Sequence, residues 1–307
     1  MSNLAKRLIT AGVGIPLLFL LLFAYDGEAV PAVLLVLVVL LLWECSALLH
    51  INGLARRTVY SGLGGLAFLF VVTMSQDAMV LTLDQASRLI SPLISVLLAW
   101  FIFWVVVSDE MRRFWISRSK SETPQARPLI TLRISEATLT AKVFLSIGCF
   151  LMLVGFGVAL YSLQVYVGPG VLVYVLAIAW GTDTGAYFVG RAIGKRPLAQ
   201  HISPKKTIEG TIGGCFLGCL LALILGFSWL QPMVGWSSIF VLSMAIAIPL
   251  TAVIGDLFES VLKRISDAKE SGNILPGHGG LLDRVDSLVI AVPLVLSMSI
   301  LLDYTRQ

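Results

Sequence analysis

Long apolar runs, separated by short polar segments, follow one another along almost the whole chain. A transmembrane helix needs about 20 predominantly apolar residues, and nine runs approach or reach that length. We therefore predict nine membrane spans, at residues 8–25, 30–49, 59–74, 89–107, 143–163, 170–189, 211–230, 238–258 and 287–302. The predicted fold class is an all-α polytopic membrane protein.

The composition agrees with this pattern and excludes a soluble globule. Only 13% of the 307 residues are charged and 57% are hydrophobic, whereas soluble domains carry about 25% charged residues. The four cysteines all fall inside apolar runs, where they resemble small buried hydrophobic residues. We therefore expect neither a disulfide framework nor a zinc site.

The distribution of Lys and Arg predicts how the chain is oriented, because cytoplasmic loops are enriched in these residues. With a cytoplasmic N-terminus and nine alternating spans, all but two of the 22 Lys and Arg fall on the cytoplasmic side. The exceptions are Arg88 and Arg306. We therefore predict a C-terminus outside and cytoplasmic polar segments that include residues 108–142, 190–210 and 259–286. The absence of a long N-terminal extension favours a bacterial inner membrane.

Three regions follow from this topology. Residues 1–107 form an N-terminal transmembrane scaffold of four spans, residues 108–142 a basic segment, and residues 143–307 a C-terminal catalytic domain of five spans. The basic segment interleaves Phe114 and Trp115 with arginines, a pattern typical of interfacial segments that bind anionic headgroups. The alternative is a solvated linker whose charge only sets the topology.

One carboxylate, Glu44, lies within the second span among Leu and Trp residues. A carboxylate inside a membrane span is by default a functional or interhelical hydrogen-bonding group. The sequence supports equally well a residue near the cytoplasmic interface that reaches water.

The charged stretch at residues 260–286 is flanked on both sides by apolar spans. It contains four cations and four carboxylates, which are Lys263, Arg264, Lys269, Arg284, Asp267, Glu270, Asp283 and Asp286. So many charges beside the membrane are costly unless they serve a purpose. We therefore expect a site for a polyphosphate and a metal ion at the membrane surface.

Three carboxylates are the candidate metal ligands of this site. Asp256 lies near the end of the eighth span, and Asp283 and Asp286, three residues apart, are expected on one face of the helix that begins the ninth span. Converging carboxylates repel one another unless a cation neutralises them, and oxygen ligands suit Mg²⁺ or Mn²⁺. The alternatives are that Asp256 pairs with Lys263 in helix packing, and that Asp283 and Arg284 cap the last span.

A glycine-rich turn lies between these carboxylates. Gly277, Gly279 and Gly280 offer a bare backbone of the kind that holds phosphate oxygens. Three nearby cations, Lys263, Arg264 and Arg284, are candidates to neutralise charge on a polyphosphate. His278, within the turn, is a candidate general acid or base, or a loop histidine that binds a headgroup or the backbone.

A second candidate region spans residues 180–210. Asp183 interrupts the end of the sixth span, and a basic segment follows it. Within that segment, Ser203, Lys205, Lys206 and Thr207 lead into the seventh span. The first N–H groups of a helix favour anions, so this arrangement predicts a phosphate site. The alternative is that the cations here only set the topology.

These stretches resemble the signature of phosphatidate cytidylyltransferases, also called CDP-diacylglycerol synthases. The family's pattern matches here at Ser260, Leu262, Lys263, Arg264, Lys269, Leu275, Pro276, His278, Gly279, Gly280, Leu281, Asp283, Arg284, Val285 and Asp286. Residues 183–187 and 203–207 also resemble family motifs. The likeness is specific in the C-terminal half, whereas the first four spans match only as a hydrophobic scaffold. Glu270 departs from the pattern, which has Asp there, so we leave it out of the metal set.

The resemblance implies a reaction in which CTP and phosphatidate give CDP-diacylglycerol and pyrophosphate. It implies one or two Mg²⁺ ions held by Asp256, Asp283 and Asp286, with Asp183 as a further ligand or orienting group. Lys205, Lys206 and Arg284 are then the phosphate-binding cations. The implied partners are CTP, phosphatidate and membrane lipids, with no nucleic acid.

Other functions remain open from sequence alone. A CTP-dependent polyprenol or lipid kinase shares a related membrane scaffold, an ion-coupled transporter also uses intramembrane carboxylates, and an inactive homologue would serve only as a binding partner. The glycine-rich spans allow close helix packing either within a monomer or between the protomers of a homodimer.

Overall fold

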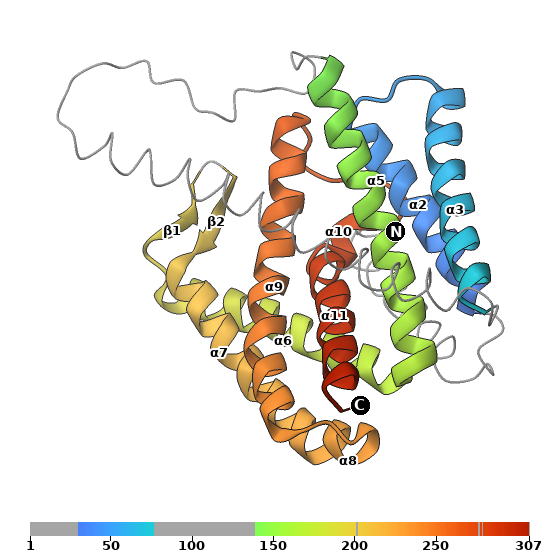
Figure 1. Cartoon of the computed structure of the whole chain (residues 1–307). Helices are drawn as coiled ribbons and strands as arrows, with labels where there is room; N and C mark the ends of the chain where they lie inside the picture. Colours follow the sequence, from blue (N-terminus) through green and yellow to red (C-terminus); the bar gives the residue numbers. More distant parts are fainter. Residues whose placement is uncertain (1–29, 77–138, 201, 276, 278, 307) are drawn as a thin grey trace.

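The computed structural model describes residues 30–76, 139–200, 202–275, 277 and 279–306 (Figure 1). Its long helices are α2 (Val30–Leu48), α3 (Leu54–Gln76), α5 (Leu139–Ser162), α6 (Pro169–Ile193), α7 (Ile208–Leu225), α9 (Ser238–Ile265) and α11 (Leu288–Arg306). The shorter elements are η4 (Leu163–Val167), β1 (Pro197–Ala199), β2 (Ser203–Thr207), η5 (Gly226–Leu230), α8 (Gln231–Val234) and α10 (Leu282–Val285). The predicted spans 8–25 and 89–107, and the segment 108–138, lie outside the described residues.

Five helical segments within the described ranges are long and apolar enough to cross a membrane. They are Val30–Leu48, Lys142–Val167, Pro169–Ile193, Ile208–Val234 and Ser238–Ile265. Two further predicted spans are also helical, in α3 and in α11, whose apolar part is Leu288–Ile300. The described chain is therefore a mostly helical integral membrane protein, and the total of nine spans stays a prediction.

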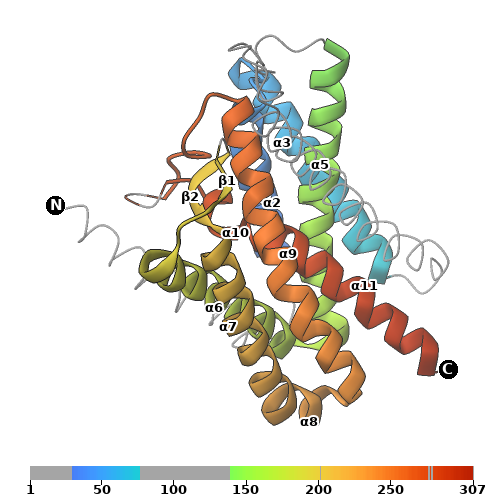
Figure 2. The same ribbon diagram turned by 90° about the vertical axis from the view of Figure 1, so that its left-hand side faces the viewer.

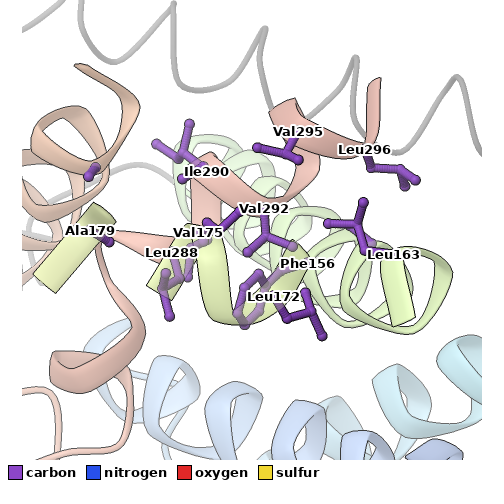
Figure 3. Close-up of a cluster of buried hydrophobic side chains, with 14 of the residues drawn as sticks. Phe156, Leu163, Leu172, Val175, Ala179, Leu288, Ile290, Val292, Val295 and Leu296 are labelled. Carbon is purple, nitrogen blue, oxygen red and sulfur yellow. The ribbon is translucent and has the colours of Figure 1, made fainter. Parts of the chain in front are cut away.

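The long helices form two groups joined by α11. On one side α2, α3 and α5 pack together, and on the other α6, α7 and α9 do so. The last helix, α11, contacts α9, α5 and α6 (Figures 1 and 2). Figure 3 shows part of the shared core, in which buried α11 side chains such as Ile290 and Val292 lie near Phe156 of α5 and Val175 of α6.

The α6–α7 pair is held together by small residues. A Cβ atom added to Gly185 would lie 3.1 Å from the Gly214 Cα atom. Apolar side chains have no preference for each other over lipid, so membrane helices associate through such close backbone packing. On the outer side of α7, Ile212, Phe216 and Ile224 are exposed, as lipid-facing residues are. This packing fixes the rotation of α6 and therefore the position of Asp183.

Two predicted boundaries near the charged stretch are wrong. Helix α9 continues to Ile265, well past residue 258, so Lys263 and Arg264 lie on the same rigid helix as Asp256. Asp283 and Asp286 do not share one helix at the beginning of the ninth span. Asp283 lies in the single turn of α10, and the chain turns again at Asp286 before α11 begins. At the beginning of α10, the N–H groups of Leu281 and Leu282 donate to Glu44 of α2.

Candidate active site

The C-terminal part of α9 carries charged side chains on one face. Asp256, Glu259 and Lys263 are spaced by three and four residues, which places them on the same side of a helix. The Lys263 Nζ atom donates to Glu259 Oε2 at 2.5 Å and to Asp283 Oδ1 at 2.7 Å. Lys263 therefore joins α9 to α10 instead of pairing with Asp256.

The second carboxylate oxygen of Asp283 also accepts hydrogen bonds from protein donors. Asp283 Oδ2 accepts the N–H groups of Ser271 and Gly280, each at 2.9 Å, and lies 3.0 Å from Ser271 Oγ. Burial by itself raises the pKa of this carboxyl, but the hydrogen bonds from Lys263 and Ser271 outweigh it and lower the pKa to about 2. Asp283 is thus ionised at neutral pH and holds the loop closed. Direct metal ligation by Asp283 stays a prediction.

The β1–β2 hairpin brings a second lysine to α9. Buried Ala199 and Ile202 pack against Leu257 and Val261 of α9. The Arg264 Nε atom donates to the Ile202 carbonyl oxygen at 3.0 Å. The docked hairpin lies beside α9 (Figure 2) and presents Lys206, whose ammonium group forms an ion pair with the Asp256 carboxylate.

A third carboxylate reaches this position from the turn after α10. Gly255 of α9 lies against the backbone of Asp286, where any Cβ atom would collide with the Asp286 carbonyl oxygen. Burial and then the Asp256 and Asp183 carboxylates raise the pKa of Asp286 to about 7, against the opposing effects of the Ser287 N–H and Lys206. Asp183, Asp256, Asp286 and Lys206 therefore form one electrostatic cluster, contributed by α6, α9, the α10–α11 turn and β2.

The remaining predicted residues are placed as follows. Lys205 and Arg284 are exposed, and Ser203 is half-buried at the beginning of β2. The Thr207 hydroxyl accepts the Gly210 N–H at 3.1 Å and thereby caps α7, and the phosphate site at this helix end stays a prediction. Arg264 anchors the hairpin, as described above.

Two glycines of the turn adopt a backbone conformation that strains other residues. Gly277 has φ +78° and Gly279 has φ +83°, a region that residues with a Cβ atom rarely adopt. The N–H of Gly280 binds Asp283 instead of facing outward. His278, the candidate general acid or base, lies outside the described residues.

The structure carries no ligands. The chemical type of the residues present, which are carboxylates, is compatible with binding of a divalent ion. Among the described residues, no three His, Cys, Asp or Glu side chains are already gathered in a ligating arrangement. The carboxylates of Asp183, Asp256 and Asp286 nevertheless interact: besides burial, which is the larger cause, the negative charges of Asp256 and Asp183 raise the pKa of Asp286. An oxygen-only donor set with such an excess suits Mg²⁺.

Two contributors to this site were not among the predicted residues. Glu259, four residues before Lys263, is 1% exposed, and its Oε1 atom has no hydrogen-bond partner. Ser271 donates its N–H to Asp283 Oδ2, and its hydroxyl oxygen lies 3.0 Å from the same atom. The spacing of Glu259 from Lys263 was a usable signal, whereas nothing in the sequence singles out Ser271.

These observations define the class of protein: a polytopic membrane protein with a cluster of carboxylates and lysines at one end of its helices. The sequence profile of the cytidylyltransferase family matches residues 5–302, which is nearly the whole chain. The chain therefore belongs to the cytidylyltransferase family.

Individual relatives agree with this assignment. The chain is 45% identical to a phosphatidate cytidylyltransferase of Haemophilus influenzae over 135 residues, which is 43% of this chain and 46% of the relative. It is 46% identical to the Bacillus subtilis protein of the same name over 120 residues, covering 39% and 44% of the two chains. The Pseudomonas aeruginosa protein of that name is 41% identical over 124 residues, covering 40% and 45%. The matched segment thus spans about half the length of each relative.

Proposed function

We propose that this protein transfers the cytidylyl group of CTP to phosphatidate, forming CDP-diacylglycerol and pyrophosphate. The observation that carries the proposal is the cluster of Asp183, Asp256, Asp286 and Lys206 at one end of a membrane bundle. Membership in the cytidylyltransferase family and the names of three bacterial relatives support the same reaction.

The chemistry needs no nucleophile from the protein. An oxygen of the phosphatidate monoester forms a bond to the α-phosphorus of CTP, and the bond between the α-phosphorus and the bridging oxygen to the β-phosphate breaks. Both reactants are anions, so the protein must hold them in line and neutralise their charge. A membrane location suits this task because phosphatidate stays in the bilayer while CTP stays in water.

We assign magnesium to Asp256 and Asp286, with Asp183 as a third oxygen donor. Bound Mg²⁺ would neutralise the triphosphate and stabilise the leaving pyrophosphate. Manganese is the alternative ion, and whether one ion or two bind is left to metal titration. Asp283, whose oxygens accept bonds from Lys263, Ser271 and Gly280, would orient the loop.

The cations have separate tasks in this proposal. Lys206, whose side chain is half-buried, neutralises Asp256 through their ion pair. Lys205 and Arg284 are exposed, and their positive charges would attract the phosphates of CTP. Lys263 and Arg264 act through Asp283 and the hairpin, respectively.

Lys206→Gln tests the role of the hairpin. Loss of a cation beside the phosphates is expected to raise the KM for CTP about tenfold and to lower kcat by a similar factor. Lys195→Gln is the matched control, because Lys195 is an exposed lysine between α6 and α7 whose backbone N–H donates to Glu209. Steady-state kinetics in mixed micelles measure both variants. Equal effects of the two substitutions would contradict a specific role for Lys206.

The reaction itself is tested with purified protein, phosphatidate, Mg²⁺ and CTP labelled at the α-phosphate. We expect the label to enter the lipid fraction, one pyrophosphate to be released per lipid product, and chelation by EDTA to stop both. Label that remains in water as CDP would indicate a CTP-dependent lipid kinase. Absence of any nucleotide turnover across the range of magnesium concentrations would overturn the proposal.

We further propose nine spans with a cytoplasmic N-terminus, and a site that faces the cytoplasm from a bacterial inner membrane. The distribution of Lys and Arg supports this orientation, and the relatives named above are bacterial. Reporter fusions at the C-terminus and at residue 270 are expected to report opposite sides of the membrane. The homodimer stays a prediction.

A further inference from the structure

Glu44 is a buried carboxylate in the N-terminal scaffold, far in sequence from the carboxylates described above. It is the charged residue of α2 and is only 2% exposed. A carboxylate in apolar surroundings is costly unless protein donors satisfy its oxygens. Its burial excludes the interpretation in which Glu44 reaches water at the membrane surface.

The donors that satisfy Glu44 all belong to the loop that ends at Asp283. Glu44 Oε1 accepts the Leu281 N–H at 2.9 Å. Glu44 Oε2 accepts the Leu282 N–H at 2.8 Å and the Ser271 hydroxyl at 3.1 Å. One side chain of α2 therefore holds both ends of a loop that begins at Ser271 and closes at the first residues of α10.

The loop backbone is shaped to receive this carboxylate. A Cβ atom added to Gly272 would lie 2.5 Å from Glu44 Oε1, and one added to Gly280 would lie 2.7 Å from Glu44 Oε2. Both distances are shorter than real Cβ contacts. The two glycines therefore leave the space that the carboxylate occupies, and no larger residue fits there without displacing it.

The same contacts continue into the candidate active site. Ser271, which binds Glu44, also donates its N–H to Asp283 Oδ2 at 2.9 Å. Asp283 in turn accepts the Lys263 ammonium group at 2.7 Å. Three residues after Asp283, the chain reaches Asp286 against Gly255 of α9. A shift of the loop relative to α2 would therefore move Asp283 and Asp286 together.

We propose that Glu44 is a positioning residue, through which α2 of the N-terminal scaffold fixes the loop that carries Asp283 and Asp286. The inference rests on the proposed function and extends it, because it gives the N-terminal spans a part in the site beyond membrane anchoring. Displacing reacting groups by about 1 Å lowers turnover about 100-fold. A positioning role therefore predicts an effect on kcat, not only on stability.

The test compares Glu44→Gln with the control Ser46→Ala in the full-length protein. Glutamine keeps the size of the side chain but replaces one carboxylate oxygen, an acceptor, with an NH₂ group, a donor. This NH₂ group then faces a donor of the loop, so a hydrogen bond is lost. Ser46 is also buried on α2, and within the described chain its hydroxyl group bonds to the Trp43 carbonyl and to Arg57 Nε, at 2.6 and 3.0 Å, instead of to the loop. Its substitution thus removes a buried polar contact of α2 without touching the site.

We expect Glu44→Gln to lower kcat by about 10- to 100-fold while the KM for CTP changes by less than about threefold. Hydrogen–deuterium exchange of residues 271–285, followed by mass spectrometry, is expected to accelerate in Glu44→Gln and to stay unchanged in Ser46→Ala. Wild-type turnover by Glu44→Gln, unchanged exchange in the loop, or an equal loss of kcat in Ser46→Ala would overturn the inference. If wild-type protein makes no CDP-diacylglycerol, the proposed function fails, and loop exchange still decides whether Glu44 holds the loop.

Discussion

Asp286→Asn is expected to lower turnover by about 100-fold or more while the protein still inserts into the membrane. The substitution removes a negative charge from the cluster that we propose binds magnesium, where electrostatic stabilisation of the transition state is worth about 10²–10³-fold per group. The residual activity should require a higher Mg²⁺ concentration for half-maximal rate. Magnesium titrations of the wild type and the variant measure this shift.

For the same variant we expect turnover to fall but thermal stability to be maintained or to rise. Because burial and the neighbouring carboxylates raise the pKa of Asp286 to about 7, its ionised form is disfavoured in the metal-free folded protein. A neutral Asn removes that repulsion, so the Tm in magnesium-free buffer at pH 8 should equal or exceed that of the wild type. Glu270→Gln, a change at an exposed carboxylate of the preceding loop, serves as the control and should match wild type. An unaltered magnesium requirement in Asp286→Asn would rule out its role as a ligand.

Asp283→Asn is expected to abolish most activity by a different route. Its carboxylate accepts Lys263 on one oxygen and two backbone N–H groups on the other. The amide of Asn must turn its NH₂ group toward one of these donors, which leaves either Lys263 or the loop without an acceptor. A lost partner for a buried charged group costs about 1–3 kcal/mol or more, so the Tm should fall as well.

The pair of variants separates a metal ligand from a residue that holds the loop. In Asp283→Asn we expect a lower Tm, faster hydrogen exchange in residues 271–285 and a magnesium requirement close to that of the wild type. Glu270→Gln is the matched control, since Glu270 is an exposed neighbour in the loop. A large increase in the magnesium requirement of Asp283→Asn, with an unchanged Tm, would instead assign Asp283 to the metal.

Most of the helices could be predicted from hydrophobicity because membrane insertion is a local property of the chain. Twenty apolar residues satisfy their backbone hydrogen bonds within one helix whatever surrounds them. The expected spans therefore coincide with helices wherever the structure describes them, as at Val30–Leu48 and Pro169–Ile193. Their ends were less predictable from hydrophobicity. Helix α9 continues through charged residues to Ile265, beyond the end of its apolar run.

The candidate site was recognised from sequence through charges that are unusual beside membrane spans. Asp183, Asp256, Asp286 and Lys206 all belonged to the predicted set, and the structure brings them into one electrostatic cluster. The assignment of partners within that set was less successful. Lys263 was considered as a partner for Asp256, yet the hairpin delivers Lys206 to Asp256, and Lys263 turns to Glu259 and Asp283.

The sequence by itself determined the membrane class, the helices and the residues that belong to the charged end, because each depends on local composition or on neighbours along the chain. Only the tertiary structure decided which carboxylate faces which cation, that Asp283 and Asp286 part at a turn, and that Glu44 of α2 holds the loop. These outcomes depend on helix rotation and close packing at contacts such as Gly255 against Asp286. Charge pairing acts through space at a few ångströms, and the order of residues along the chain does not specify those distances.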